Sequence, residues 1–146
     1  MDELAQRVQA LEDREAIKEV VAMYSLHILN NETAKIPDLF ADDGVFRIAS
    51  AGLHIAGREA LIAFYNRMSP GTTYPVAQTT AIVLDGDTAT HVGVMDNPAH
   101  TGGRKGYLGV YEDSLRRVDG RWLFTDRGFR FLQGGPPTPL AATDEV

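Results

Sequence analysis

The sequence predicts an α+β domain in which helices come first and a long, mostly antiparallel sheet follows. Apolar residues recur at every third or fourth position through the first thirty residues, which is typical of helices. After residue 72 the pattern changes to strands, and Asp85-Gly86-Asp87 and Asp119-Gly120 indicate tight turns between them. This order of elements favours an α+β architecture. We expect a strongly curved sheet with the helices packed on its concave face, forming a cone-shaped barrel with one open mouth.

Three helical regions are expected before residue 70. The first thirty residues should form two helical segments, and Asp13 should cap the second one. The apolar face of that segment is expected to carry Ile17, Val21, Tyr24 and Ile28. A short helix is expected around Pro37, and a further amphipathic helix over Gly57–Met68.

The strands are expected to follow from the turn signals. Asp42-Asp43-Gly44 should turn the chain into the first strand. The predicted strands cover residues 45–50, 78–84, 88–95, 105–118 and 121–131. From Gln133 onward Gly and Pro are frequent and prevent a strand. We therefore expect one domain over residues 1–132, and an extended arm over residues 133–146 that docks on the pocket or on a neighbouring subunit.

Composition excludes several classes of function. The chain of 146 residues has the length of one domain and a net charge of −6, which argues against nucleic acid as a partner. It has no cysteine, so disulfides and zinc–thiolate sites are excluded. No apolar run approaches the ~20 residues that span a bilayer, and the acidic start is unlike a secretory signal. We expect a soluble cytoplasmic protein without membrane contact.

The sequence contains no motif for a metal or a cofactor. Its four histidines show no His-x-x-x-His spacing, and the glycine-rich loops that hold nucleotide phosphates are missing. We expect neither a metal ion nor a cofactor.

Several stretches resemble one family in the order in which that family has them. Residues 11–17 (LEDREAI) followed by Tyr24 are similar to its opening helix, and residues 39–46 (LFADDGVF) and 57–61 (GREAL) to its next elements. Residues 85–89 (DGDTA), 111–113 (YED) and 119–122 (DGRW) are similar to its hairpin strands. The family is the nuclear transport factor 2-like superfamily, in the SnoaL-like branch that contains polyketide cyclases, scytalone dehydratase and the lindane dehydrochlorinase.

The resemblance also shows where this chain departs from the family. Dehydratase-type members use an Asp late in the first helix and a His before the first hairpin as their base. Those positions fall on Leu29 and Pro75 here. Neither side chain can accept a proton, so either the base has moved or this member is not a dyad enzyme.

Other ionisable residues are candidates for catalysis. His27 lies at the border of the helix face and is a candidate general base. Asp96 ends a strand whose Val92 and Val94 should face inward, so it is either a desolvated acid or base, or a cap of the next loop. Tyr24 is either a hydrogen-bond donor to substrate or a core aromatic residue.

Two candidates come from the resemblance. It implies that Tyr111 lines the pocket and that Arg127 lies where the dehydrochlorinase has an arginine that stabilises an anion. The alternative for Arg127 is a structural ion pair with Asp43 or Asp113. The remaining pocket lining is expected to comprise Ile28, Leu29, Phe46, Ile48, Phe64, Val92, Val94, Tyr107 and Phe129. His54 and His91 should be exposed or lie between subunits.

Two functions remain open. The first is a cofactor-independent lyase or isomerase that acts on a small hydrophobic, aromatic or polyketide-like molecule. The second is a non-catalytic ligand-binding module or the small subunit of a ring-hydroxylating dioxygenase. In either case we expect a homo-oligomer, a trimer or a dimer, because a sheet of this kind usually covers its outer face with a partner.

Overall fold

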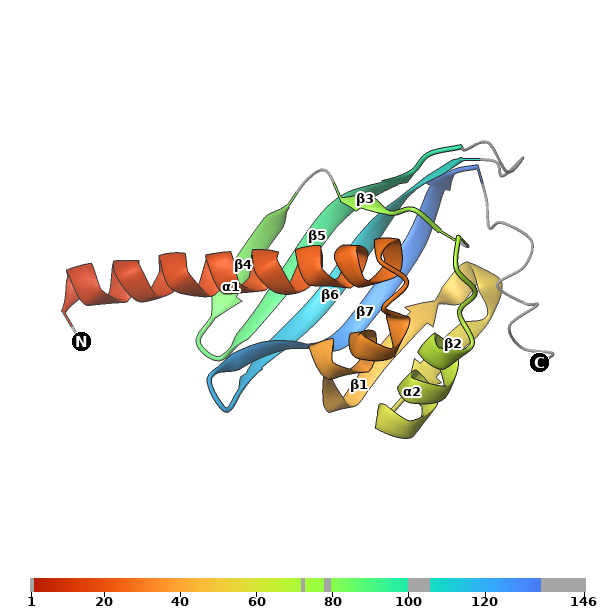
Figure 1. The fold of residues 1–146 in the computed structure, drawn as a ribbon. Helices are drawn as coiled ribbons and strands as arrows, with labels where there is room; N and C mark the ends of the chain where they lie inside the picture. The colour runs from red at the N-terminus through yellow and green to blue at the C-terminus, as the bar shows by residue number, and fades with distance from the viewer. Residues whose placement is uncertain (1, 72, 78–79, 100–105, 135–146) are drawn as a thin grey trace.

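A computed structural model describes residues 2–71, 73–77, 80–99 and 106–134, and it confirms the predicted α+β fold. The long helix α1 (Glu3–Leu29) lies across one face of a strongly curved sheet (Figure 1). The short helix α2 (Arg58–Asn66) packs beside β1 and β2, near one end of the sheet. Two 3-10 helices, η1 (Thr33–Leu39) and η2 (Ala49–Ala51), complete the helical part.

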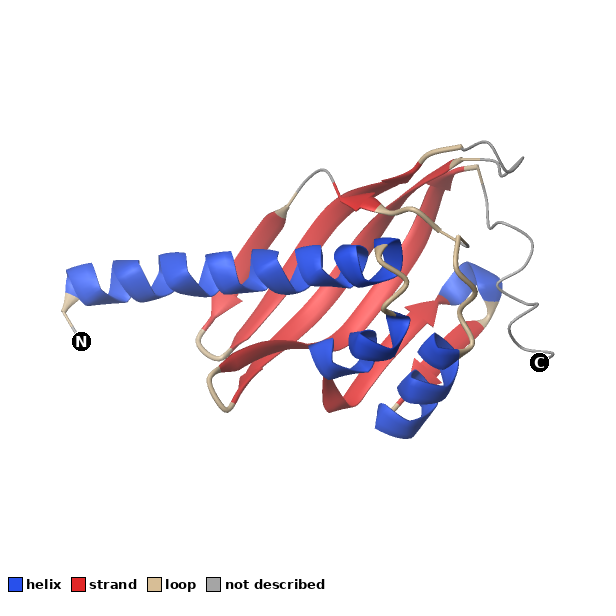
Figure 2. Ribbon diagram, in the orientation of Figure 1, coloured by secondary structure: helices blue, strands red, loops and turns tan. Residues whose placement is uncertain are grey.

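Seven strands form one sheet, which stays open at its edges (Figure 2). They are β1 (Phe40–Ile48), β2 (Leu53–Ala56), β3 (Val76–Ala77), β4 (Ala81–Asp85), β5 (Thr88–Asn97), β6 (Tyr107–Val118) and β7 (Arg121–Gln133). Their order is β2-β1-β7-β6-β5-β3, and β4 pairs with another part of β5. Only β1 and β7 run parallel. The long strands β5, β6 and β7 therefore form the centre of the sheet, directly under α1.

The two predicted hairpin turns are confirmed. Gly86 and Gly120 have φ angles of 60° and 77°, in the left-handed region that glycine adopts without a steric penalty. The turn expected at Asp42-Asp43-Gly44 is wrong, because these residues lie within β1, where the pairing with β7 shifts its register. The strands β2 and β3 were not predicted, because four and two residues are too few to show an alternating pattern.

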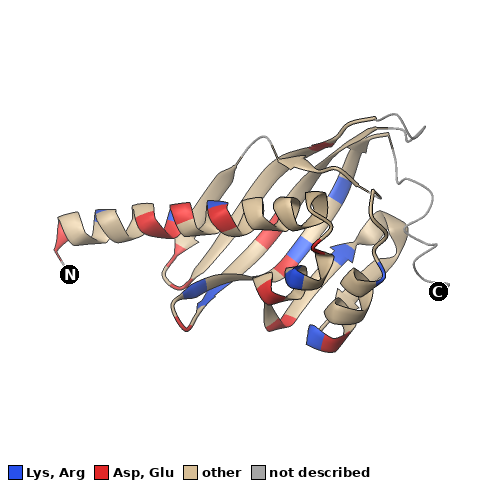
Figure 3. Ribbon diagram, viewed as in Figure 1, with Lys and Arg blue, Asp and Glu red and all other residues tan. Residues whose placement is uncertain are grey.

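The predicted break in the first helix is also wrong, since α1 continues without interruption from Glu3 to Leu29. Its capping residue is Asp2, whose carboxylate accepts a hydrogen bond from the Ala5 amide at 2.7 Å. Charged residues are concentrated in the first two thirds of α1, and the final turns over the sheet carry none (Figure 3). No described helix is both long enough and apolar enough to cross a membrane.

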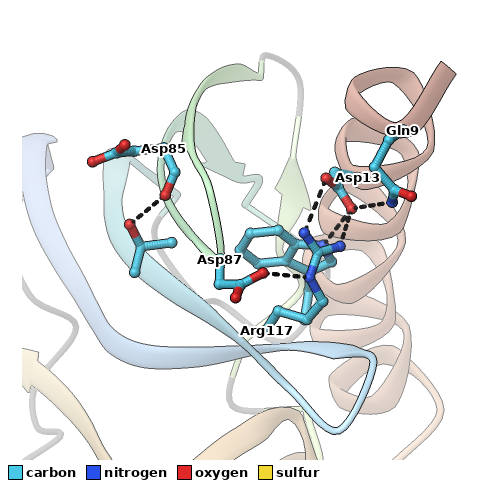
Figure 4. A network of polar contacts seen from close by, with 7 residues as sticks. Gln9, Asp13, Asp85, Asp87 and Arg117 are labelled. Carbon is cyan, nitrogen blue, oxygen red and sulfur yellow. Dashed lines mark hydrogen bonds and ion pairs between the residues drawn. The ribbon is translucent and has the colours of Figure 1, made fainter. Parts of the chain in front are cut away.

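Asp13 is instead buried in the middle of α1, and it joins this helix to the end of the sheet at the β6–β7 hairpin (Figure 4). Its carboxylate binds the Arg117 guanidinium and accepts a hydrogen bond from Trp122 Nε1 at 3.1 Å. Arg117 Nε also donates to Asp87 Oδ1 at 2.9 Å. Burial by itself would raise the pKa of Asp13, but the hydrogen bonds from Arg117, Trp122 and Gln9 outweigh it and hold that pKa below its usual value. An ionised carboxylate therefore fastens the helix to the β6–β7 hairpin.

The core lies between α1, α2 and the inner face of the sheet. The helices contribute Ile17, Val21, Tyr24, Ile28, Leu61, Phe64 and Tyr65, all of them buried. The sheet contributes Phe46, Ile48, Tyr107, Tyr111, Leu115, Phe124 and Phe129. Much of this lining is aromatic, so the concave side of the sheet is a continuous layer of rings.

Candidate active site

Three ionisable side chains from neighbouring strands meet within this aromatic layer. His91 on β5 pairs with Asp113 on β6, which in turn pairs with Arg127 on β7. Because residues directly opposite each other point to the same face of a sheet, this register brings the three side chains together. None of them is more than 1% exposed. The sheet thus places a charged cluster at the centre of the fold.

Asp113 connects the other two members of this cluster. Its Oδ2 atom accepts a hydrogen bond from Arg127 Nη1 at 3.0 Å and lies 2.7 Å from His91 Nδ1. An ionised carboxylate can only accept, so Nδ1 of the imidazole carries the proton in this pair. In a neutral ring the other nitrogen, Nε2, then has a free lone pair. This is the arrangement in which a carboxylate holds a histidine in the tautomer of a general base.

Four polar atoms of the cluster have no hydrogen-bond partner within the described part of the chain. They are His91 Nε2, Asp113 Oδ1, and Arg127 Nε and Nη2. Buried polar groups are paired in the large majority of cases, and leaving one unpaired costs about 1–3 kcal/mol. A group of unpaired buried atoms of this kind can be satisfied by an ordered water or by a polar ligand.

The Arg127 guanidinium is surrounded by aromatic rings. Its carbon lies 3.5 Å from the ring centre of Tyr111, 4.3 Å from that of Tyr24 and 4.5 Å from that of Phe124. The negative faces of such rings attract a cation, more strongly when water is excluded. Burial would lower the pKa of Arg127, but Asp113 and the neighbouring tyrosines outweigh this and raise it. Arg127 is therefore permanently charged.

Three tyrosines surround this cation and keep their protons. Burial is the main cause that raises the pKa of Tyr24, Tyr65 and Tyr111. The hydroxyl oxygens of Tyr24 and Tyr65 are 2.8 Å apart and share a hydrogen bond. The site therefore combines one cation, one carboxylate, one imidazole and neutral phenols in water-excluded surroundings.

The structure brings together three of the five predicted catalytic residues, Tyr24, Tyr111 and Arg127. Its aromatic layer also contains several of the predicted lining residues. Phe46 packs 6.5 Å from Tyr24, and Phe129 packs 5.2 Å from Tyr111, between ring centres. Phe64, Tyr107 and Ile48 are buried in the same core. The ion pair between Arg127 and Asp113, which the sequence left as an alternative, is present.

The predicted orientation of β5 is wrong. Val92 and Val94 were expected to face inward, with Asp96 at the end of their face either as an acid or base or as a loop cap. The inner face is formed instead by the other set of alternating residues, which includes His91 and Met95. The prediction assumed that the apolar valines must be buried. In the structure the aromatic residues of the neighbouring elements fill much of the interior, and the inward face of β5 carries Ala89, His91, Gly93, Met95 and Asn97. Its valines lie on the outer face, where Val92 is exposed.

The expectation that His91 is exposed or lies between subunits is wrong for the same reason, because it is buried inside the chain, whereas His54 is exposed. A signal for His91 and Asp113 was present in the sequence. Tyr107, Gly109 and Tyr111 alternate along β6, and the next residue on the same face is Asp113. The sequence did not reveal the register that places His91 opposite that carboxylate.

The remaining candidates are not among the hydrogen-bonded members of the charged cluster. His27 is buried near the end of α1, and Leu29, the last residue of α1, is exposed. Ile28 borders a small cavity of about 20 Å³ between the end of α1 and the segment after α2. Pro75 is buried just before β3. Residues 135–146 of the predicted arm lie outside the described residues.

The outer face of the sheet carries a hollow of its own. This open depression has a volume of about 440 Å³ and extends over β4, β5, β6 and β7. Its rim includes Val83, which is 66% exposed, together with Thr90, Ser114 and Thr125. It lies on the side of the sheet opposite to the charged cluster.

Comparison with known proteins identifies a matching family and solved structures of similar fold. The family model described as SnoaL-like domain matches residues 9–128. An NTF2-like protein with a cystatin-like fold from Novosphingobium aromaticivorans has a TM-score of 0.78 and 22% identity, with 97% of this chain and 93% of that chain covered. A putative scytalone dehydratase from the same species has a TM-score of 0.72 and 23% identity, with coverages of 85% and 87%.

A third solved structure is the hexachlorocyclohexane dehydrochlorinase LinA-type3 from Novosphingobium barchaimii. It has a TM-score of 0.70 and 16% identity, with 90% of this chain and 94% of that chain covered. No curated protein matches the sequence. At these identities the structural similarity establishes the fold.

Proposed function

The chain belongs to the SnoaL-like domain family, and we propose that it is a cofactor-independent lyase or isomerase for a small hydrophobic molecule of aromatic or polyketide-like character. Enzymes and non-enzymes share such a fold, so the fold alone does not indicate an activity. The proposal therefore rests on the side chains of the candidate site. One observation carries it: His91 is held by Asp113 with its Nε2 lone pair free, beside the cation of Arg127.

The proposed reaction begins with a proton transfer. His91 Nε2 takes a proton from a substrate carbon next to a carbonyl group. The electron pair of the C–H bond forms a carbon–carbon double bond, and the π pair of the carbonyl group moves onto its oxygen. Arg127 and the Tyr111 hydroxyl stabilise that oxyanion, and Asp113 stabilises the imidazolium. The imidazolium then returns the proton, either to a leaving hydroxyl group on the neighbouring carbon or to another carbon of the substrate. The first outcome is an elimination and the second an isomerisation.

This assignment changes the base that the sequence suggested. His27 and Asp96 were the candidates, but neither is a member of the cluster around Arg127. His91 also fills the role left open by Leu29 and Pro75 at the family's usual dyad positions. The strands β5 and β6 thus supply a histidine–aspartate pair that the first helix does not.

The experiment measures carbon-proton exchange in D2O by NMR, with aryl ketones and β-hydroxy ketones as probes. We expect exchange or elimination with the wild-type protein and a loss of at least about 10²-fold in H91Q and D113N, the usual contribution of a positioned general base. H54Q is the matched control, because His54 is exposed on β2, and it should retain full activity. Equal activity in folded H91Q would show that His91 is not the base, and no turnover of any probe would argue against an enzyme.

The second function is a ligand-binding module or a dioxygenase small subunit. The observation that favours it is the pair Leu29 and Pro75, which removes the base that dehydratase-type relatives use. Native mass spectrometry after incubation with the same probes separates the two functions. A retained, chemically unchanged ligand supports the module, and a product of altered mass or a free product supports the enzyme.

We also propose that the chain forms a homo-oligomer through the outer face of its sheet. The support is the open hollow there and the exposed Val83 and Val92 beside it. Light scattering at micromolar concentration should give a multiple of the 16.0 kDa chain mass, and V83E should shift it toward the monomer. A wild-type mass near 16.0 kDa would contradict this proposal.

A further inference from the structure

The guanidinium of Arg127 has one edge in use and one edge free. Nη1 donates to Asp113, whereas Nε and Nη2 have no partner among the described residues. Nε and Nη2 lie on the same side of the planar group, so their N–H bonds point in parallel toward one position. Such a pair of parallel donors is the geometry that binds the two oxygens of a carboxylate.

The surroundings of Arg127 leave this edge as the position for a ligand. The rings of Tyr111, Tyr24 and Phe124 lie around its carbon at 3.5–4.5 Å and pack against the guanidinium. Asp113 accepts the hydrogen bond from Nη1 and so occupies that side of the guanidinium. A polar ligand that approaches the cation therefore meets the Nε–Nη2 edge.

The cost of burying an anion here can be met by the residues around it. Asp113 already balances the charge of Arg127, so a bound carboxylate needs further donors. The raised pKa values of Tyr111, Tyr24 and Tyr65 keep their hydroxyl groups protonated. Tyr111, whose ring packs against the guanidinium, is such a donor to an anionic substrate.

We propose that this free edge of Arg127 binds a carboxylate of the substrate, so that the substrate class is small aromatic carboxylic acids. The inference rests on the proposed function of the same site and adds the group by which the substrate is recognised. With the carboxylate on Nε and Nη2, the oxyanion of the proposed reaction accepts its hydrogen bond from the Tyr111 hydroxyl, and Arg127 stabilises it through its charge alone. A carboxylate engages both donors, whereas a neutral amide oxygen or a phenol oxygen engages them poorly. The aromatic layer around Arg127 holds the rest of the molecule.

The test compares carboxylates with neutral analogues of the same shape. Benzoate, phenylacetate and cinnamate, and the three corresponding amides, are titrated into the full-length protein by calorimetry. We expect each carboxylate to bind at least about 10-fold more tightly than its amide, since a charge-assisted bidentate pair is worth more than a neutral contact. Equal affinity of carboxylates and amides would overturn the inference.

The matched variants are R127K and R130K, which make the same substitution on the same strand. R127K keeps the charge that Asp113 needs but loses the parallel donors, so it should lose the preference for carboxylates. Arg130 is exposed and pairs with Glu112, so R130K should bind like the wild type. Wild-type carboxylate affinity in folded R127K would overturn the inference. If R127K does not fold, the comparison of carboxylates and amides in the wild-type protein tests the inference on its own.

The outcomes also separate this inference from the proposed function. Carboxylate-selective binding without any turnover would support the carboxylate site and contradict the enzyme. Turnover of neutral ketones that is lost in H91Q, with no preference for carboxylates, would support the enzyme and contradict the carboxylate site.

Discussion

The hydroxyl groups of Tyr24 and Tyr65 lie 2.8 Å apart although the two residues are separated by 41 positions in the sequence. Both side chains are buried, and their rings meet edge to face at 6.0 Å between centres. This contact joins α1 to α2, and both helices thereby hold phenol groups next to Arg127. The geometry of the candidate site therefore depends on how these two helices pack.

The first prediction concerns this pair of tyrosines. Y65F removes one hydroxyl and leaves the other without its partner, which should lower the free energy of unfolding by about 1–3 kcal/mol. Removing both hydroxyls in Y24F/Y65F should cost less than the sum of the two single changes, because no unpaired group remains. Urea unfolding of the four proteins in a double-mutant cycle measures this, and strict additivity would contradict a shared hydrogen bond.

A second prediction follows from the raised pKa values of Tyr24, Tyr65 and Tyr111. In the unfolded chain these groups lose their protons near pH 10, whereas in the folded protein they keep them. The unfolded state then binds fewer protons, so stability falls as the pH rises above about 10, by up to about 1.4 kcal/mol per pH unit for each tyrosine. Absorbance at alkaline pH should show these three tyrosines ionising only as the protein unfolds.

A third prediction concerns Asp13, whose pKa is lowered by its partners on β6 and β7. The stability it contributes is present above its unfolded pKa of about 3.9 and is lost as the pH falls through the lower folded value. D13N should destabilise the domain by about 1–3 kcal/mol at pH 7, because Arg117 and Trp122 lose a charged acceptor. D87N is the control: Asp87 is exposed and contacts Arg117 alone, so it should cost less than about 1 kcal/mol. Equal losses in the two variants would refute this role of Asp13.

A fourth prediction concerns the close packing of Gly109 under Phe129. A Cβ atom added at Gly109 would lie 2.0 Å from the Phe129 ring. G109A should therefore displace that ring and lower stability by about 1–3 kcal/mol, as overpacked cores do. The second variant G109A/F129L makes room for the methyl group, and it should recover part of the loss. A thermal melt of G109A that matches the wild type would show that the ring moves freely.

The sequence predicted the elements that depend on local patterns. The hairpins at Asp85-Gly86-Asp87 and Asp119-Gly120 were found because turn residues act through their own backbone. The helix over residues 57–68 followed from its apolar spacing in the same way. The candidate site depends instead on the register between strands, which a single strand does not encode. His91 and Arg127 are 36 positions apart, and they meet only because β6 lies between β5 and β7.

The role of Asp13 was predicted wrongly because a local pattern suggested a helix cap. Its residue type suits a helix cap, and no local pattern indicated that Arg117 and Trp122, more than one hundred positions away, would bind its carboxylate. The inversion of β5 has a similar origin. Burial was assigned from the hydrophobicity of β5 alone, although the aromatic residues of other elements decide which face is inside.

The overhang of α1 has a consequence for how the protein fluctuates. Leu4, Val8 and Leu11 are exposed, and Figure 1 shows the start of the helix extending past the edge of the sheet. Arg117 and Trp122 hold the helix at Asp13, whereas the turns before it carry exposed apolar side chains, so their backbone hydrogen bonds should open more readily. Hydrogen exchange should therefore divide one straight helix into two parts, with rapid exchange before Asp13 and slow exchange after it. The anchored part, which carries Tyr24, remains closed while the first three turns open and close.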